Sequence, residues 1–400
     1  MNNFIKLKSI AQIYSGGTPS RENLEYWNGE IPWVKTGQIQ NNLIKPNDVD
    51  EYVTQLGLKK SSAKIAPKGT ILMAMYGQGK TRGQVGILDM DASINQACCA
   101  IEPKSNVSKD FLFQYLLFCY KEIRKISNDG GQKNLSSSLI KNLKIPLPPL
   151  PEQKAIADIL EKWDEAIEKT SKLIEAKKNK FRWFRNNVLT GRVRVGNYKL
   201  PWDLKLVKNI LSEHGMTSTG KEEVHSVSVH KGVINQIEHL GRSFSAKNTD
   251  HYNLVKPGDI IYTKSPTGDF PYGIIKQNKL QEEVIVSPLY AIFTPKTHEL
   301  GAILDAYFES SINTSNYLKP VIQKGAKNTI SCNNDQFLSR KLFLPTDEKE
   351  ERFLVKYINT AKKEITLLEG MLAKYKNQKK GLMQKLLTGK LRISNKKEFK

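Results

Sequence analysis

The sequence lacks the features of a membrane or secreted protein. Its 400 residues contain no apolar run near the ~20 residues that a bilayer-spanning helix needs, so we expect no membrane span. The opening MNNFIKLKSI has neither an apolar core nor a small-residue cleavage site, which argues against secretion. Cysteines are few and form no C-x-x-C pair, so we expect no disulfide framework and a cytoplasmic location; they are Cys98, Cys99, Cys119 and Cys332.

Catalytic and metal-binding patterns are also missing. The six histidines form no H-E-x-x-H motif and have no cysteine neighbours, so we expect no metal site, with His225 and His230 as the weak alternative for zinc. No G-x-G-x-x-G loop occurs, and neither does the Asn/Asp-Pro-Pro-aromatic motif with which amino-methyltransferases position adenine. We therefore expect no catalytic residues, no cofactor on this chain and no enzymatic activity of its own.

One segment imitates a nucleotide-binding loop. Ala74-Met-Tyr-Gly-Gln-Gly-Lys80-Thr81 fits a relaxed phosphate-loop pattern if alanine replaces the first glycine. A true phosphate loop leads into a helix, whereas Gln84–Leu88 has the pattern of a strand. A P-loop nucleotide hydrolase is therefore the unfavoured alternative, and Lys80 and Arg82 become candidate DNA contacts.

Positive charge is the property present in excess. Lysine and arginine number 62 against 40 aspartate and glutamate residues, a formal net charge of +22. Such an excess is typical of proteins with a polyanionic partner, nucleic acid first. Seven basic residues and no acid lie between Lys177 and Arg194, a run that fits either a solvated helix face or a contact with phosphate or a protein partner.

An internal repeat organises the chain. Leu189-Thr-Gly-Arg-Val-Arg-Val195 recurs 198 residues later as Leu387-Thr-Gly-Lys-Leu-Arg-Ile393. Upstream of each copy, apolar residues recur with alternating spacings of four and three, which predicts two long helices that pack as a coiled coil. The predicted seam consists of Ile156, Leu160, Trp163, Ile167, Ile174, Phe181, Phe184 and Val188 in the first helix, and Leu354, Ile358, Ile365, Leu368, Leu372, Leu382 and Leu386 in the second.

The repeat predicts the fold class and the domain order. We expect an α+β chain in which residues 1–147 and 199–344 form two mixed α/β domains. Residues 148–198 and 345–400 form the two helices, each about 38 residues or roughly 57 Å long. Equivalent segments of one chain pair most simply about a pseudo-twofold axis, so the coiled coil is predicted to be antiparallel. Gly191 and Gly389 are expected to cap the helices in left-handed conformation.

With this tandem arrangement, the motifs resemble the specificity subunit of type I restriction-modification systems. Ser15-Gly-Gly-Thr-Pro19 and Ile31-Pro-Trp-Val-Lys-Thr-Gly37 are similar to the opening of that family's target recognition domains. Leu147-Pro-Pro-Leu-Pro-Glu-Gln153 is similar to the entry into its central helix. The second copy departs in detail, since it reads Thr346-Asp-Glu-Lys-Glu350 at the helix entry.

The resemblance implies a non-catalytic subunit that recognises DNA sequence. Each recognition domain would read half of a bipartite, asymmetric site in double-stranded DNA, and the paired helices would set the spacing between the halves. The helices would also bind two DNA adenine methyltransferase subunits, which motor-nuclease restriction subunits join for cleavage. S-adenosylmethionine and ATP would bind those partners. A related bipartite enzyme with a fused methyltransferase-nuclease remains the alternative assembly.

Loop residues that can donate or accept hydrogen bonds in a DNA groove are the candidates for base and phosphate contacts. For each of them, the ordinary alternative is a solvated loop side chain. The candidates are Lys35, Thr36, Gln38, Gln78, Lys80, Arg82, Gln84, Gln132, Lys133 and Asn134 in the first domain, and Lys264, Ser265, Thr267, Tyr272, Lys324, Lys327 and Asn328 in the second.

Overall fold

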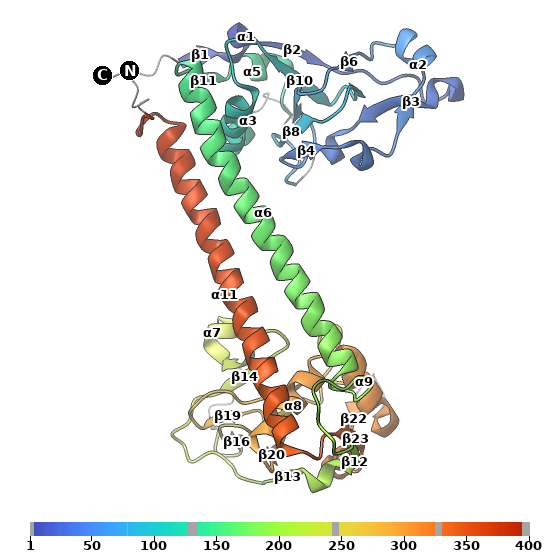
Figure 1. The fold of residues 1–400 in the computed structure, drawn as a ribbon, viewed down its shortest axis with the longest axis vertical. Helices are drawn as coiled ribbons and strands as arrows, with labels where there is room; N and C mark the ends of the chain where they lie inside the picture. The colour runs from blue at the N-terminus through green and yellow to red at the C-terminus, as the bar shows by residue number, and fades with distance from the viewer. Residues whose placement is uncertain (1–3, 78, 127–133, 242–247, 325–329, 394–400) are drawn as a thin grey trace. The chain divides into compact units, whose positions relative to one another are not determined.

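The computed structural model describes residues 4–77, 79–126, 134–241, 248–324 and 330–393. The chain divides into two compact units, described here separately. The first consists of residues 1–170 with 371–400, and the second of residues 171–370. Two long helices, α6 (Leu150–Asn187) and α11 (Glu348–Leu386), each contribute one half to either unit (Figure 1). Of the helices in the described ranges, none is long and apolar enough to cross a membrane.

The long helices begin and end as the sequence predicts. Asp347 precedes α11 and accepts a hydrogen bond from the backbone N–H of Lys349 at 2.8 Å, which satisfies a donor of the first turn. Beyond the C-terminal ends, Gly191 and Gly389 have φ angles of 73° and 71°. In both copies the chain then folds back on the helix, since Val193 N–H bonds the Asn187 carbonyl and Leu391 N–H bonds the Lys385 carbonyl, each at 3.0 Å.

The first unit contains two small sheets and a strand pair that leads into α6. The five-stranded sheet has the order β2 (Ala11–Ser15), β10 (Cys98–Pro103), β7 (Ile71–Ala74), β8 (Val85–Leu88) and β4 (Asn42–Ile44). The four-stranded sheet has the order β5 (Tyr52–Val53), β3 (Trp27–Val34), β9 (Ala92–Ile94) and β6 (Ile65–Ala66). Strand β1 (Phe4–Lys6) pairs antiparallel with β11 (Lys144–Pro146), which ends four residues before α6.

Short helices complete the first unit. They are α1 (Leu7–Ile10), α2 (Gln55–Lys59), α3 (Lys109–Phe118), α4 (Tyr120–Lys125) and α5 (Ser137–Lys141). Helices α3 and α4 follow one another directly and meet at Cys119. Phe111 and Leu116 of α3 belong to one buried cluster with Ile156 and Leu160 of α6 and Leu386 of α11. The start of α6 and the end of α11 thus form part of the core of this unit.

The second unit is built around a four-stranded antiparallel sheet. Its order is β13 (Leu211–Glu213), β20 (Ala291–Pro295), β17 (Ile260–Tyr262) and β18 (Ile275–Gln277). Strand pairs surround it: β12 (Asp203–Leu206) with β23 (Lys341–Leu344), β14 (His225–Ser228) with β15 (Gly232–Asn235), β16 (Asn253–Val255) with β19 (Val284–Val286), and β21 (Gln323–Lys324) with β22 (Ile330–Ser331). The helices are α7 (Gln236–Leu240), α8 (His298–Phe308), α9 (Ser311–Leu318) and α10 (Asn334–Leu338).

The internal repeat extends beyond the helices into the sheets. The strand order β2-β10-β7-β8 of the first unit corresponds to β13-β20-β17-β18 of the second. The pair β1–β11 that precedes α6 corresponds to β12–β23, which precedes α11. A helix follows β10 in the first unit (α3) and β20 in the second (α8). The two domains therefore share one framework, although their sequences match only weakly.

Within each unit, the segments of α6 and α11 run antiparallel. In the first unit, Glu152 Oε2 lies 2.7 Å from Arg392 Nη2, and Asp164 Oδ1, twelve residues later, lies 2.5 Å from Lys379 Nζ. In the second unit, Phe184 stacks on Tyr357 at 4.3 Å and Lys177 Nζ lies 2.6 Å from Glu364 Oε1. In both units, residue numbers that rise along one helix pair with numbers that fall along the other. The antiparallel pairing is thereby confirmed within each unit.

The predicted seam residues lie on the inner sides of the two helices. Nine of the fifteen are buried, most of them toward the helix ends: Ile156, Leu160, Ile174, Phe181, Phe184, Val188, Leu354, Ile358 and Leu386. Trp163, Ile167, Ile365, Leu368, Leu372 and Leu382 are half-buried. The same spacing also falls on three polar residues: Thr170, which is buried and donates to the Ala166 carbonyl, Lys177, which pairs with Glu364, and Lys379, which pairs with Asp164.

An arginine–glutamate pair recurs in both units. Arg194 Nη2 lies 2.5 Å from Glu350 Oε2 in the second unit, and Arg392 Nη2 lies 2.7 Å from Glu152 Oε2 in the first. Both arginines lie in the repeated motif that follows one long helix, and both glutamates lie in the first turn of the other. The acidic side chain also suits the positive end of its helix. Each pair fixes the end of one helix to the start of the other.

The two pairs differ in burial, which allows a matched test. The Glu350 and Arg194 side chains are 1% and 32% exposed, whereas those of Glu152 and Arg392 are 9% and 53% exposed. We expect Glu350→Ala to lower the free energy of unfolding by about 3 kcal/mol, because it leaves Arg194 without its buried partner. Glu152→Ala removes a more solvated pair and should cost about 1 kcal/mol or less. Urea unfolding of the full chain measures both, and equal losses would contradict the role of burial.

Candidate nucleic-acid interface

The phosphate-loop segment is a β-hairpin. Strand β7 ends at Ala74 and pairs antiparallel with β8, which begins at Val85, four residues after Thr81. A strand therefore follows this loop where a nucleotide-binding loop would require a helix N-terminus. Gly77, Gly79 and Gly83 have φ angles of 131°, 64° and 83°, so glycines serve the turn of the hairpin.

The hairpin separates its candidate residues into outward and inward groups. Lys80 is exposed and Gln84 is half-buried. Arg82 is buried, and its Nη2 donates to the Arg124 carbonyl at the end of α4 at 3.0 Å. In this conformation Arg82 holds α4 against the hairpin and does not point to solvent. Gln78 lies outside the described residues.

The candidates after β3 belong to a charged network. Lys35 Nζ lies 3.2 Å from Asp50 Oδ2 and 2.5 Å from Glu51 Oε1, and Gln38 Nε2 donates to Asp50 Oδ1 at 2.9 Å. Thr36 lies between them and is half-buried. The hydrogen bond with Glu51 raises the pKa of Lys35, and the hydrogen bond from Lys35 lowers the pKa of Asp50. These side chains are fixed in orientation by their own ion pairs.

Arg21 is a member of this network that the sequence did not reveal. Its Nη1 lies 2.5 Å from Glu51 Oε2, and its guanidinium lies 3.8 Å from the ring centroid of Trp27 and 4.9 Å from that of Trp33. The two tryptophans are buried core residues whose rings meet edge to face at 5.0 Å. Arg21 thus covers a tryptophan pair and keeps an exposed edge beside Lys35.

The backbone brings the candidate segments of the first unit to one region. Asn95 N–H bonds the carbonyl of Val34, the residue before Lys35, at 2.9 Å. Met75 N–H bonds the Ala97 carbonyl at 2.9 Å, and Leu135 N–H bonds the Met75 carbonyl at 3.0 Å. The end of β3, the β7–β8 hairpin and half-buried Asn134 therefore adjoin the same short loop. Gln132 and Lys133 lie outside the described residues.

In the second unit, the candidates lie in the equivalent hairpin, between β17 and β18. Ser265 and Thr267 are exposed, and Thr267 and Phe270 exchange two backbone hydrogen bonds of 3.0 Å that close the loop. Tyr272 is half-buried and its carbonyl accepts a hydrogen bond from the Tyr262 hydroxyl at 2.9 Å. Lys264 is a non-glycine residue with φ of 52°, and its Nζ donates to Asn334 Oδ1 at 2.7 Å. Lys264 therefore points toward α10.

The candidate segment around Lys324 in the second unit corresponds to the segment around Asn134 in the first. Lys324 ends β21, whose partner β22 precedes Cys332, and Cys332 is buried in one cluster with Tyr262 at the end of β17. The loop after α9 thus approaches the β17–β18 hairpin, as Asn134 approaches the β7–β8 hairpin. Lys327 and Asn328 lie outside the described residues.

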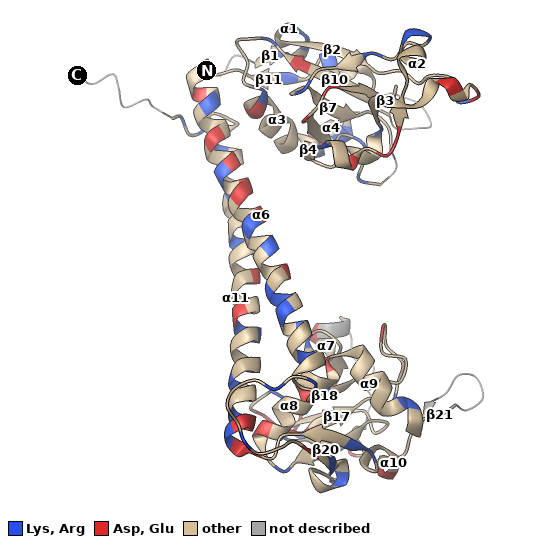
Figure 2. Cartoon of the chain, turned by 45° about the vertical axis from the view of Figure 1, so that its right-hand side comes forward, with Lys and Arg blue, Asp and Glu red and all other residues tan. Residues whose placement is uncertain are grey.

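Much of the basic run on the helices is engaged within the chain. Figure 2 shows lysine and arginine along α6, and four residues of the 177–194 run form ion pairs in the second unit. They are Lys177 with Glu364, Lys178 with Glu369, Arg185 with Glu309 and Arg194 with Glu350. In the second helix, Lys374, Lys376, Lys380, Lys385 and Lys390 are exposed. A solvated face and an ion-paired seam together account for this pattern.

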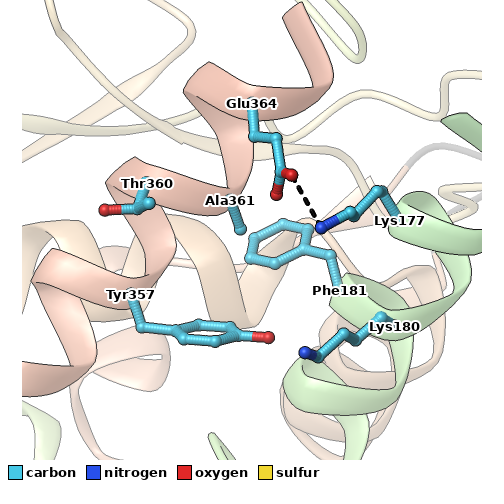
Figure 3. A pocket seen from close by; sticks show the side chains of 7 residues that line it. All are labelled: Lys177, Lys180, Phe181, Tyr357, Thr360, Ala361 and Glu364. Carbon is cyan, nitrogen blue, oxygen red and sulfur yellow. Dashed lines mark ion pairs between the residues drawn. The ribbon is translucent and has the colours of Figure 1, made fainter. Parts of the chain in front are cut away.

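A small hollow lies beside the helix seam in the second unit (Figure 3). It has a volume of about 90 Å³, and its lining is Lys177, Lys180, Phe181, Tyr357, Thr360, Ala361 and Glu364. Figure 3 shows the Phe181 ring reaching from α6 toward Ala361, between Tyr357 and the Lys177–Glu364 ion pair. The hollow lies between side chains of the two packed helices, and we assign no ligand to it.

A buried cluster of charges connects the second unit to both long helices. Asp305 of α8 accepts hydrogen bonds from Gln277 N–H at 3.1 Å, from Lys362 of α11 at 3.2 Å and from Lys279. Glu309, one turn later, lies 2.5 Å from Lys362 Nζ and 3.2 Å from Arg185 Nη1 of α6. The two carboxylates of α8 thereby hold one residue from each long helix. No local sequence pattern identifies this cluster.

His225 and His230 do not gather with other ligands. His225 Nδ1 lies 3.1 Å from the Glu223 carbonyl. Throughout the described ranges, no group of three or more His, Cys, Asp or Glu side chains is arranged to hold a metal ion.

Comparison with known proteins identifies relatives along the chain. Residues 2–178 match the family described as "Type I restriction modification DNA specificity domain". The specificity subunit of type I restriction enzyme MjaIX from Methanocaldococcus jannaschii is 28% identical over 266 residues, 62% of this chain and 60% of that protein. The EcoR124I/EcoR124II specificity subunit from Escherichia coli is 26% identical, and the match spans 45% of this chain and 46% of that protein. The EcoKI specificity subunit from Escherichia coli K12 is 23% identical over 96% of this chain and 88% of its own length.

The fold is that of solved specificity subunits. The S subunit of a type I restriction-modification system from M. genitalium matches with a TM-score of 0.58 and 14% identity over 96% of both chains. The HsdS subunit from Thermoanaerobacter tengcongensis matches with a TM-score of 0.51 and 15% identity over 97% of both chains. The arrangement of mixed α/β domains and two long helices is confirmed.

The charge cluster around Asp305 should make the second unit sensitive to acid. Burial alone would raise the pKa of Asp305, but Lys362, Lys279 and Lys276 together hold it well below its ordinary value of 3.8. A depressed carboxyl pKa stabilises the fold above the unfolded value, and this stabilisation is lost as the pH falls below 3.8 toward the folded pKa. We expect Asp305→Asn to remove that pH dependence and to cost about 3 kcal/mol at neutral pH.

Urea midpoints from pH 7 down to pH ~2.5 measure this effect across the ordinary carboxyl range. Asp269→Asn, which alters an exposed aspartate of the same unit, is the matched control and should keep the wild-type profile. Parallel profiles for Asp305→Asn and the wild type would refute the assignment.

Proposed function

We propose that this chain, which belongs to the family of type I restriction-modification specificity subunits, is the DNA-reading subunit of such a complex. Residues 1–147 and 199–344 are then target recognition domains, and each reads one half of a bipartite, asymmetric DNA site. The observation that carries the proposal is the shared framework of the two units. The same strand order supports an equivalent hairpin in each, 75–84 and 263–274, beside an equivalent second loop.

A protein that recognises two different half-sites with two similar domains needs different side chains at equivalent positions of the shared framework. The first hairpin offers Lys80 and Gln84, while the second offers Ser265 and Thr267. Lysine and glutamine can bind guanine and adenine edges, and serine and threonine can bind either donors or acceptors. The network of Arg21, Lys35 and Gln38 is held in place before DNA arrives, which lowers the ordering cost of a contact.

The two long helices are proposed to set the distance between the half-sites. At 38 and 39 residues each spans about 57 Å, longer than the ~34–36 Å between sites one helical turn apart on B-DNA. Residues 148–198 and 345–400 are the corresponding helical segments. The antiparallel pairing and ion pairs within each unit give this spacer stiffness.

Catalysis belongs to partner subunits in this proposal. Two DNA adenine methyltransferase subunits would bind the helical segments, and motor-nuclease restriction subunits would complete the cleaving complex. S-adenosylmethionine and ATP would bind those partners, in the cytoplasm. The hairpin geometry of residues 74–88 supports this division, because it lacks the strand-to-helix turn of a nucleotide site.

Exchange of one recognition domain tests the division of labour. We expect replacement of residues 1–147 by the corresponding domain of another family member to change one half of the methylated sequence only. The measurement is methylome sequencing of cells that carry the hybrid with its methyltransferase. The reciprocal replacement of residues 199–344 is the control and should change the other half. A change of both halves by either exchange would contradict the proposal.

Insertion into the helices tests the spacer. Seven residues inserted after Ile167 and after Ile365 preserve the heptad seam and lengthen both helices by about 10 Å. We expect the same half-sites with a longer gap, of roughly three base pairs at 3.4 Å each. An insertion into α6 alone should break the register and reduce methylation. An unchanged gap after the double insertion would refute the spacer role.

A further inference from the structure

The second unit contains a solvent-open cavity next to the charge cluster of α8. It has a volume of about 300 Å³ and lies among the β14–β15 turn, the end of β18, α8 and α11. Its charged lining consists of His230, Lys231, Lys276, Lys279, Asp305, Glu309 and Lys362. All of these residues belong to the second unit, so the cavity is complete within it.

Positive charge in this cavity exceeds negative charge. Four lysine ammonium groups line it with two carboxylates, which leaves two positive charges without a compensating anion. Arg185 also pairs with Glu309 and adds a third. Like charges brought together in a partly desolvated space repel strongly, so this arrangement favours an anion in the cavity.

Lys276 is the residue that indicates where the anion binds. It is 7% exposed, and its Nζ lies 4.0 Å from Glu309 Oε1, beyond hydrogen-bond distance. That carboxylate oxygen is already bound by Lys362 at 2.5 Å. Within the part of the chain that the structure describes, Lys276 Nζ makes no hydrogen bond. The side chain is buried along its length while Nζ opens onto the cavity, so its three N–H donors are available there to an acceptor.

The pKa of this lysine also reflects its burial. Burial lowers the pKa of Lys276, and the negative charges of Asp305 and Glu309 only partly oppose the effect. An anion beside Nζ would reverse the direction of this shift, because it stabilises the charged form.

We propose that this cavity binds an oxyanion of the phosphate class. A phosphate carries up to two negative charges, which equals the excess of the lining lysines over the carboxylates. Its oxygens accept several hydrogen bonds, and lysines bind such a group as point charges from different directions. Lys276 and Lys231 bind the anion, while Asp305 and Glu309 keep Lys279 and Lys362 oriented at the wall.

The oxyanion has two sources that present the same phosphate oxygens, free phosphate with up to two negative charges and a phosphodiester of the DNA backbone with one. The first makes the cavity a small-anion site that braces α8 against α11. The second makes it a phosphate contact outside the hairpins assigned to base reading. The experiment below separates the two sources, and its free-phosphate arm does not depend on the proposed function.

The test uses the full chain, with its methyltransferase subunits if these are needed for solubility. Inorganic phosphate binding is measured by calorimetry at constant ionic strength, and DNA affinity is measured on a duplex that contains the methylated site. The variants are Lys276→Met and Lys231→Met. The second alters an exposed residue at the cavity mouth and remains informative if the first does not fold. Lys341→Met, at an exposed lysine of β23 in the same unit, is the control.

We expect both cavity variants to weaken binding of a phosphate-class anion by about tenfold, as loss of one charge-assisted hydrogen bond predicts, with no change in Lys341→Met. A loss confined to inorganic phosphate identifies the free anion, and a loss confined to duplex affinity identifies the backbone phosphate. No phosphate binding together with unchanged duplex affinity would overturn the proposal. Phosphate binding that is equal in the wild type and both variants would also overturn it.

Discussion

The antiparallel contact between α6 and α11 is the interaction on which the rest of the structure depends. In each unit it places the first half of one helix against the second half of the other, so neither helix has a complete core without its counterpart. Apolar seam residues of both helices are buried in the core of each unit, while the Arg194–Glu350 and Arg392–Glu152 pairs fix the ends. The two pairs occupy equivalent positions in the repeat. In each unit, the arginine that follows one long helix therefore binds the glutamate in the first turn of the other.

Charge on this chain has two separate roles. Beside the helix seam, Lys177, Lys178, Arg185 and Arg194 pair with glutamates, so they stabilise packing, while other helix lysines such as Lys374 and Lys376 are exposed. On the hairpins, Lys80, Ser265 and Thr267 face solvent and remain available to a ligand. The count of 62 lysines and arginines therefore overstates the number of cations that a polyanion would meet, and the location of each cation matters more than their number.

The helices could be predicted because their signals are local. Apolar spacing, capping glycines and a 198-residue repeat all lie along the sequence, and the long helices and their antiparallel pairing follow from them. The loop residues could not be predicted in the same way, since a side chain's direction depends on neighbours remote in sequence. Arg82 turns inward to a carbonyl of α4, and Lys264 turns toward Asn334, although both resemble solvent-facing loop cations.

The charged clusters show the same limit more clearly. Arg21 contacts Glu51 and the rings of Trp27 and Trp33. Asp305 contacts Lys279, which follows β18, and Lys362 of α11. A run such as Gly-Ala-Ile-Leu-Asp-Ala-Tyr in α8 resembles an ordinary amphipathic helix with one acid. Only the tertiary arrangement reveals that this acid is buried among three ammonium groups.

The composition of the first unit has a consequence for biosynthesis. Leu386 and Leu387, near the end of the chain, are buried in one cluster with Ile156 and Leu160. The ribosome reaches these leucines more than 200 residues after residue 170, so the nascent first unit presents an uncovered apolar stripe during that interval. Folding of residues 1–170 therefore awaits a segment made much later, and a nonsense mutation before Leu386 would damage the unit that residues 1–170 begin.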